Sequence, residues 1–315
     1  MLTSSNIRSM LLGALVADAA ALGVHWIYDV KRLSDVAKAR GATAFTPVDP
    51  TNYNGVPAYF AHGARLSGDL TQYGEVLRLM IKHLADGTLD VAAYQQEYAA
   101  YFGAGGAYSS YIDRPTRGAL ANIDAEREIS GIDDDQLPAT ATLPAVFAAF
   151  HGADTLGARL SAAMEVTNVN AIAQDYCTVF ADVLKRLTAG ESLNQALRAA
   201  ANVARDAAVK SALNAALDEA SSDSIAYGEQ TGRACHLPMA GPLVFHILTH
   251  ANSFADAVER NNRAGGDSAG RAILIGAVMG LIHGLDDAHG IPLSWVLNLR
   301  NGQQIWEECQ TLVSA

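Results

Sequence analysis

The sequence predicts an all-α protein, folded as a single compact multi-helix bundle. Apolar residues recur at helical spacing along most of the chain, and no run of alternating β-branched residues extends beyond a few positions. Half of the residues are hydrophobic (50%) and only 17% are charged, so the chain can bury a large core. Neither a linker-like stretch nor an internal repeat interrupts the pattern. We therefore expect one domain over residues 1–315.

The first expected helix contains the apolar stretch at residues 10–22, with Ser4 or Ser5 as its cap. Because Arg8 precedes this stretch, it superficially resembles a signal peptide. Asp18 argues against that interpretation, since a carboxylate in the middle of an apolar segment is costly in a bilayer. No later segment reaches the ~18 uncharged apolar residues that a membrane span requires. The stretch is interpreted as a buried helix.

Further helices follow at regular intervals. The next one contains Val76 to Leu84 and stops at Gly87, and others are expected at residues 90–102, 139–150, 156–164, 171–189 and 193–220. Loops rich in Gly, Pro, Asn or Asp are expected at residues 43–68, 103–117, 129–138 and 226–241. Tyr94, Tyr98 and Tyr101 form one stripe of a helix, which is typical of core packing.

Charge and cysteine usage exclude several classes of partner. The 22 Lys and Arg residues stand against 33 Asp and Glu residues, a net charge of −11 that repels phosphate backbones and anionic lipid. We expect neither a nucleic-acid partner nor a membrane partner. Cys177, Cys235 and Cys309 are far apart and odd in number, which favours a reducing compartment and a cytoplasmic protein.

Generic catalytic motifs are missing from the sequence: there is no HExxH, CxxC pair, Walker loop, GxSxG or dinucleotide fingerprint. His246 and His250 lie four residues apart on one predicted helix face and could share a metal, but no third ligand is tied to them by spacing. Packing is the favoured interpretation of both. The acidic run at residues 133–135 is expected to be a solvated loop without a role.

Four local patterns carry more information. The first is Gly-Ala-Leu-Val-Ala-Asp-Ala-Ala-Ala-Leu-Gly-Val-His-Trp-Ile-Tyr-Asp at residues 13–29, and the second is Ser-Gly-Asp-Leu-Thr-Gln-Tyr-Gly-Glu at residues 67–75. The third begins as Gly-Gly-Asp-Ser-Ala-Gly-Arg at residues 265–271 and continues into a helix of Gly-spaced small residues that ends near residue 284. The fourth is Gly-Ile-Pro-Leu-Ser-Trp at residues 290–295.

In this order, from Gly13 to Trp295, the four patterns together resemble the ADP-ribosylglycohydrolase family. The resemblance implies a compact bundle of many helices, in agreement with the periodicity. It also implies a paired magnesium site, built in that family from a Thr-Asp-Asp-Thr segment and a Gly-Gly-Asp-Thr-Asp-Thr segment. Clustered carboxylates at two helix starts suit Mg²⁺, which prefers oxygen ligands in a near-octahedral arrangement and can hold ribose hydroxyls and polarise a water.

This sequence departs from the family at both segments. The first reads Thr-Gln-Tyr-Gly at residues 71–74, and the second reads Asp-Ser-Ala-Gly at residues 267–270. Only Thr71 and Asp267 match the metal ligands, and one hydroxyl with one carboxylate cannot hold two divalent ions. We expect no paired magnesium site, which leaves a site without a cofactor or one with a single Mg²⁺ ion.

A third departure is His25, which stands where the family has a glutamate. A histidine can serve as a general acid or base, since its unperturbed pKa of ~6.5 lies near working pH. The alternative is that His25 and Trp26 pack the floor of a pocket. The Thr-Gln-Tyr-Gly-Glu and His-Trp-Ile-Tyr-Asp segments, and Cys235 in Gly-Arg-Ala-Cys-His-Leu-Pro, are similar to the branch of the family that includes the eye-lens J-crystallins, which carries the fold without the full metal cluster.

Two functions remain open at this point. In the first, the protein hydrolyses an N- or O-glycosidic ADP-ribose bond or a related nucleoside bond, in a small-molecule or ADP-ribosylated substrate, with His25, Glu75 and Asp267 as catalytic residues. In the second, it is an inactive pseudoenzyme or crystallin-like protein that keeps the fold, with or without a nucleotide-binding cleft.

The resemblance further implies which residues surround the ligand. Because the two helix starts form the family's ligand site, we expect Thr71, Tyr73, Glu75 and Asp267 to line one cleft. The glycines before Asp267 let backbone amides approach an anionic ligand. The alternatives are a structural carboxylate at Asp18 and a solvated Glu75. The expected ligand-binding residues are Asp18, Trp26, Thr71, Tyr73, Gly265, Gly266 and Ser268.

Overall fold

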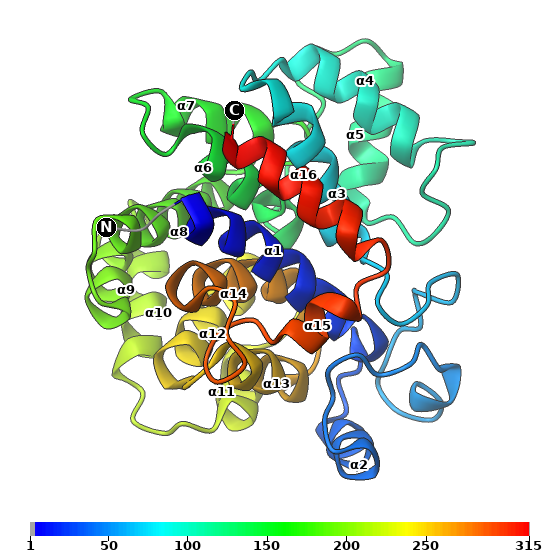
Figure 1. The fold of residues 1–315 in the computed structure, drawn as a ribbon, viewed down its shortest axis with the longest axis vertical. Coiled ribbons are helices and arrows are strands. Elements are labelled where there is room, and N and C mark those ends of the chain that lie inside the picture. The colour runs from blue at the N-terminus through cyan, green and yellow to red at the C-terminus, as the bar shows by residue number, and fades with distance from the viewer. Residues whose placement is uncertain (1–3, 315) are drawn as a thin grey trace.

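Helices form the framework of the protein (Figure 1). In this computed structural model, which describes residues 4–314, α-helices and short 3₁₀ turns are the regular elements, and β pairing is limited to isolated bridges. The prediction of an all-α fold is confirmed. The helices are α1 (Ser4–Ala21), α2 (Val30–Arg40), α3 (Gln72–His83), α4 (Val91–Phe102), α5 (Arg114–Asp124), α6 (Leu143–Phe150), α7 (Leu156–Met164), α8 (Ala171–Thr188), α9 (Leu193–Ala201), α10 (Ala207–Asp218), α11 (Ser224–Thr231), α12 (Leu237–His250), α13 (Phe254–Ala264), α14 (Ser268–His283), α15 (Leu293–Leu297) and α16 (Gly302–Ser314).

The centre of the bundle is the pair formed by α1 and α14 (Figure 1). Glycines allow the two backbones to approach closely, because a Cβ on Gly13 would overlap the carbonyl oxygen of Gly276. Residues 4–24 are long and apolar enough to cross a membrane, but 94% of the apolar window is buried inside the protein. The first helix is therefore a core helix. Ser4 and Ser5 both lie within this helix instead of preceding it as a cap.

Several predicted helices match the structure closely. The segment up to Leu84 folds as α3 followed by a 3₁₀ turn that ends at Gly87, and Asp90 caps α4 by accepting a hydrogen bond from the backbone N–H of Ala93 at 3.0 Å. Tyr94 and Tyr98 of α4 are fully buried in the core. Helices α7 and α8 also lie where the apolar spacing places them.

The single helix predicted at residues 193–220 is wrong, because the segment forms α9 and α10 with a break between them. A distant side chain stabilises the break. The buried carboxylate of Asp175 on α8 accepts hydrogen bonds from the backbone N–H groups of Arg205 and Asp206, each at 2.9 Å. Asp206 then caps α10. Asn202 and Asp206 mark the break locally, as the residue after α9 and the cap of α10, and the contact with Asp175 fixes the chain between them.

Three predicted boundaries are wrong because prolines begin helices in this protein. The helix expected at residues 139–150 starts only at α6, after a 3₁₀ turn at Leu137–Thr140. The loops expected at residues 103–117 and 226–241 contain the starts of α5 and α12, and the second also contains most of α11. Both helix starts carry a proline in the first turn, where a missing N–H costs nothing.

The acidic run at residues 133–135 is not simply a solvated loop. Asp134 is buried, forms an ion pair with Arg114 at 2.5 Å and accepts a hydrogen bond from the backbone N–H of Gln136 at 2.9 Å. It holds the connection between α5 and α6 in place.

His246 is fully buried and stacks on Tyr227 with a centroid distance of 4.3 Å. This arrangement agrees with the packing role that the sequence favoured for it.

Four chain segments bring the candidate residues together. Asp18 lies on α1, and His25 and Trp26 follow the 3₁₀ turn Leu22–Val24 at its end. Thr71 is the residue before α3, and Asp267 is the residue before α14. Since α1, α3 and α14 contact one another, two helix starts far apart in sequence face the same place.

Candidate active site

The turn before α14 is built by two glycines that no other residue could replace without strain. Gly265 and Gly266 have φ angles of 78° and 68°, a region that L side chains rarely adopt. The backbone N–H of Gly266 donates to the carbonyl oxygen of Ile27 at 2.8 Å, and that of Trp26 donates to the carbonyl oxygen of Gly266 at 2.9 Å. This pairing places Asp267 beside His25.

Asp267 is the centre of the site. Its carboxylate is fully buried and contacts the His25 Nε2 atom at 3.0 Å through Oδ1. The Tyr73 hydroxyl donates to Oδ2 at 2.7 Å, and the backbone N–H of Gly270 donates to Oδ1 at 3.0 Å. Burial by itself raises the pKa of Asp267, but His25 and these hydrogen bonds outweigh it and hold the pKa below its usual value. Asp267 is therefore ionised at neutral pH.

A second histidine, His62, continues the chain of contacts. His25 Nδ1 lies 2.7 Å from His62 Nε2, and the two rings stack with a centroid distance of 4.9 Å. Burial, the neighbouring His25 and Arg65 hold the pKa of His62 well below its usual value. Its other nitrogen, Nδ1, is buried without a hydrogen-bond partner. The analysis of the sequence missed His62, because it lies in a loop with no motif around it.

Trp26 covers the two histidines. Its ring stacks on His25 at a centroid distance of 4.3 Å and lies 6.1 Å from the ring of His62. Tyr111 meets Trp26 edge-on at 4.9 Å, and Tyr59 lies 5.5 Å away with more than half of its surface exposed. The φ angle of Trp26 is 63°, which is unusual for a bulky residue. These rings close the site toward the solvent.

Asp18 and Thr71 form a separate buried pair. The Thr71 hydroxyl donates to Asp18 Oδ1 at 2.5 Å, and its backbone N–H donates to Oδ2 at 2.7 Å. Burial raises the pKa of Asp18 to about 7, although the hydrogen bonds from Thr71 oppose the shift. Asp18 therefore ties α1 to the start of α3.

Gln72 and Glu75, at the start of α3, also form hydrogen bonds or ion pairs with other segments. The side chain of Gln72 accepts a hydrogen bond from the backbone N–H of Asp113 at 2.8 Å and donates to the Thr116 hydroxyl. Glu75 accepts a hydrogen bond from the Tyr101 hydroxyl at 2.8 Å and pairs with Arg65 at 3.3 Å. Glu75 is thus buried and paired, not solvated, but nothing brings it into contact with Asp267.

Arg271, one turn into α14, is the buried cation of this region. It is fully buried and its guanidinium donates to the side chain of Asn261 at 2.9 Å and to the carbonyl oxygens of Gly265 at 2.6 Å and Arg233 at 3.1 Å. Burial lowers the pKa of Arg271 to about 10, so it stays charged at neutral pH. Arg271 therefore holds the glycine turn in place and supplies positive charge near Asp267.

Ser268, which was expected to bind the ligand, is buried, and its hydroxyl has no hydrogen-bond partner.

Comparison with known proteins now gives the family. The sequence matches the ADP-ribosylglycohydrolase family over residues 2–315. The chain belongs to this family. The resemblance inferred from the four sequence patterns is confirmed, and the family is one that acts on ADP-ribosylated substrates.

The individual relatives share less than a quarter of their residues with this chain. The chain is 24% identical to Crystallin J1A and 23% identical to Crystallin J1B, both from Tripedalia cystophora, and each match covers 97% of this chain and 95% of the relative. Among solved structures, the ADP-ribosylglycohydrolase-related protein complex has a similar fold, with a TM-score of 0.74 at 15% identity over 99% of this chain and 98% of that chain.

Members of the family usually depend on metal, but the residues at the two helix starts of this protein do not fit a pair of Mg²⁺ ions. Each carboxylate oxygen of Asp267 and of Asp18 accepts at least one hydrogen bond and the Thr71 hydroxyl donates to Asp18, so these groups have few lone pairs left for two ions. Ala269 has no ligand atom. Within residues 4–314, no group of three or more His, Cys, Asp or Glu side chains is arranged to hold a metal ion.

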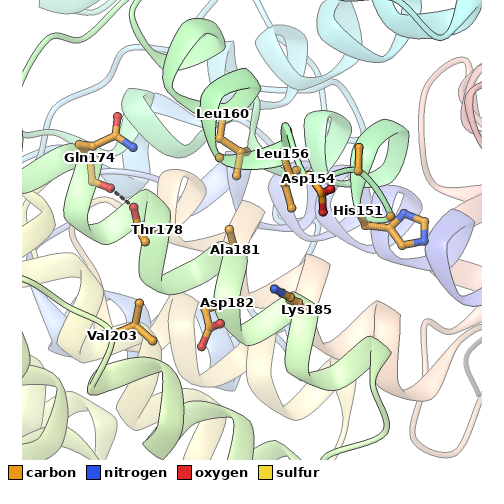
Figure 2. A pocket seen from close by; sticks show the side chains of 13 residues that line it. His151, Asp154, Leu156, Leu160, Gln174, Thr178, Ala181, Asp182, Lys185 and Val203 are labelled. Atoms are coloured by element: carbon orange, nitrogen blue, oxygen red, sulfur yellow. Dashed lines mark hydrogen bonds between the residues drawn. The ribbon is translucent and has the colours of Figure 1, made fainter.

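A surface pocket lies elsewhere, between α7 and α8. It encloses about 440 Å³. Figure 2 shows Leu156 and Leu160 of α7 facing Thr178, Ala181 and Lys185 of α8. None of the residues predicted for the active site lines this pocket.

Proposed function

We propose that this protein hydrolyses a glycosidic bond of an ADP-ribose-type substrate by acid–base chemistry that does not use a paired magnesium centre. The observation that carries the proposal is the contact of Asp267 with both His25 and Tyr73 at the start of α14. Imidazole and carboxylate at hydrogen-bond distance are the pairing that general acid–base catalysis uses. The family membership supplies the class of substrate.

The burial of this group supports a functional role over a purely structural one. His25, Tyr73 and Asp267 expose no more than 5% of their surface, and a buried ionised carboxylate is costly unless it is fully hydrogen-bonded. Apolar residues of the same volume would stabilise the fold at least as well. Groups arranged at this cost are typical of sites that do chemistry.

The reaction can be tested directly. The purified protein is incubated with ADP-ribosyl-arginine, ADP-ribosyl-serine and O-acetyl-ADP-ribose, with Mg²⁺ or with EDTA, and free ADP-ribose is measured by chromatography. We expect release that EDTA does not reduce and that Asp267→Asn lowers at least ~100-fold. Asp175→Asn, which changes another buried carboxylate outside the site, should keep the activity. Release that depends on Mg²⁺, or that survives Asp267→Asn, would contradict the proposal.

A second candidate is a protein without catalytic activity, which the relationship to the two Tripedalia crystallins favours. The closed cover of Trp26, Tyr59 and Tyr111 over the histidines fits this candidate as well. It predicts no release from any of the three substrates and no change in melting temperature with ADP-ribose. A saturating ligand at 100 Kd would stabilise the folded state by about 2.7 kcal/mol, so binding is readily detected.

A further inference from the structure

We propose that His62 is the residue that exchanges a proton with the ligand, through its free Nδ1 atom, while His25 and Asp267 behind it hold the resulting charge. The inference rests on the proposed function and names a further catalytic residue for it. His25 cannot make this contact itself, because both of its ring nitrogens are already engaged, Nε2 with Asp267 and Nδ1 with His62.

The positions of the protons follow from the partners. An ionised carboxylate only accepts hydrogen bonds, so His25 Nε2 carries a hydrogen and donates it to Asp267. Two arrangements then remain for the contact between the histidines. Either His62 donates from Nε2 to a neutral His25, or a charged His25 donates from Nδ1 to His62.

The first arrangement is favoured in the resting protein. In it, the free Nδ1 of His62 carries a lone pair, whereas in the second it carries a buried N–H with no acceptor, which is the costlier group to leave unpaired. Arg271 already supplies a buried positive charge near Asp267, so a second buried cation on His25 is not needed for balance. His62 therefore presents an acceptor at Nδ1.

The second arrangement is the one that forms when a proton arrives. A proton that enters at His62 Nδ1 allows the Nε2 proton of His62 to pass to His25 Nδ1, 2.7 Å away. The positive charge then lies on His25, directly against Asp267, and not on His62, where Arg65 and burial oppose it. The two histidines and Asp267 thus form a relay whose outer end is His62.

This relay suffices for the hydrolysis. The oxygen of a water forms a bond to the glycosidic carbon as the bond to the leaving nitrogen or oxygen breaks. One proton of that water enters at His62 Nδ1, and the reverse transfer returns a proton to the leaving group, so the relay ends in its starting state. His62 is the catalytic residue in this scheme, and His25 and Asp267 are positioning residues.

Access to Nδ1 requires a movement, because the atom is closed to solvent in this structure. The residues that can move are those that flank His62, since the loop at residues 59–70 contains no helix or strand. At its start this loop is bonded to the turn after α1, because the backbone N–H of Tyr59 donates to the carbonyl oxygen of Trp26 at 3.0 Å. A shift of these flanking residues, with the ring of His62 held against His25 by their stacking, would uncover the outer nitrogen and keep the relay intact.

The first test needs no activity. Long-range ¹H–¹⁵N correlation spectra of the full chain at neutral pH report which ring nitrogen of each histidine carries hydrogen, with His62→Gln used for assignment. We expect His62 and His25 both to be protonated at Nε2, and the Nδ1 resonance of His62 to shift when ADP-ribose is added. A ligand-free His62 protonated at Nδ1, or an Nδ1 resonance that ADP-ribose leaves unchanged, would overturn the proposal.

The second test uses activity. The amide nitrogen of glutamine can take the place of histidine Nε2, so His62→Gln keeps the donation to His25 and loses only the outer nitrogen. We expect kcat to fall at least ~100-fold with little change in KM. The matched control is His83→Gln, which removes another ring with a buried unpartnered nitrogen outside the site. Equal kcat in His62→Gln and wild type would overturn the role of His62.

The two tests separate the inference from the function on which it rests. If the wild-type protein releases no ADP-ribose, the proposed function fails. The spectra alone then decide whether His62 Nδ1 is the acceptor that meets a ligand.

Discussion

Asp267 and His25 lie 242 residues apart in the chain and meet at 3.0 Å between Oδ1 and Nε2. The glycine turn at residues 265–266 and the backbone of residues 26–27 hold them together through two hydrogen bonds. The contact uses the carboxylate that, by resemblance to the family, would serve as a metal ligand. In the proposed function, this pair of side chains does the acid–base work without a paired metal centre.

Removal of the Tyr73 hydroxyl should destabilise the protein through Asp267. Tyr73→Phe takes one of three hydrogen bonds from a buried ionised carboxylate, and hydrogen bonds to charged groups contribute about 1.5–3 kcal/mol. Tyr98→Phe is the control, since the buried Tyr98 hydroxyl bonds only neutral groups such as Thr116 and its loss should cost about 1 kcal/mol. Urea unfolding at pH 7 measures both, and equal losses would contradict the central place given to Asp267.

Asp18 should make the protein less stable as the pH rises from 4 to 7. Its pKa is about 7 in the folded protein against 3.8 in the unfolded chain, so the folded state keeps a proton that the unfolded state has released. Below pH 4 both states are protonated and the penalty vanishes. A shift of about three pKa units corresponds to roughly 4 kcal/mol.

Asp18→Asn should therefore flatten this part of the stability profile, measured by urea unfolding at several pH values. It should not remove the slope completely, because burial also raises the pKa of Asp113, to about 6. The exposed Asp154→Asn serves as the control and should leave the profile unchanged. A wild-type protein whose stability rises from pH 4 to 7, with the rise lost in Asp18→Asn, would show that the sign is wrong.

The glycine turn should not tolerate a side chain. Gly266→Ala would force a positive φ on alanine and place a Cβ against the carbonyl oxygen of Arg233, so we expect a loss of at least about 3 kcal/mol. Gly157→Ala, in α7 with no atom within 4 Å of the added Cβ, should instead stabilise the helix by up to about 1 kcal/mol. Thermal unfolding of the two variants distinguishes them, and similar melting temperatures would contradict the strain assigned to the turn.

Restored carboxylates should create magnesium binding. Gln72→Asp, Tyr73→Asp and Ala269→Asp together add three acids at the starts of α3 and α14, where acids close together repel one another until a cation neutralises them. The triple variant should melt at a lower temperature than the parent without metal and be stabilised by Mg²⁺ in calorimetry at matched ionic strength. The same response to Mg²⁺ in parent and variant would show that these three positions do not decide metal binding. Thr is not restored at position 270, because a Cβ there would lie 2.9 Å from Asp267 Oδ1.

Much of the fold could be predicted from local pattern. The apolar spacing of α3, α7 and α8 is a property of short segments, and the structure confirms these helices. The prediction of one helix at residues 193–220 failed because the break depends on Asp175, on another helix, as well as on the local cap at Asp206. His62 was missed for the same reason: only the folded chain places it against His25.

The sequence by itself determined the helical class and the family, because helical spacing and residue type are written along the chain, and it predicts the loss of the metal-binding acids. Only the tertiary structure decided what the remaining acids do. Whether Asp18 and Asp267 have free oxygens depends on which donors come within about 3 Å of them, a distance set by packing between segments far apart in sequence. The same packing, through Gly265, Gly266 and the buried Arg271, makes Asp267 a partner of His25.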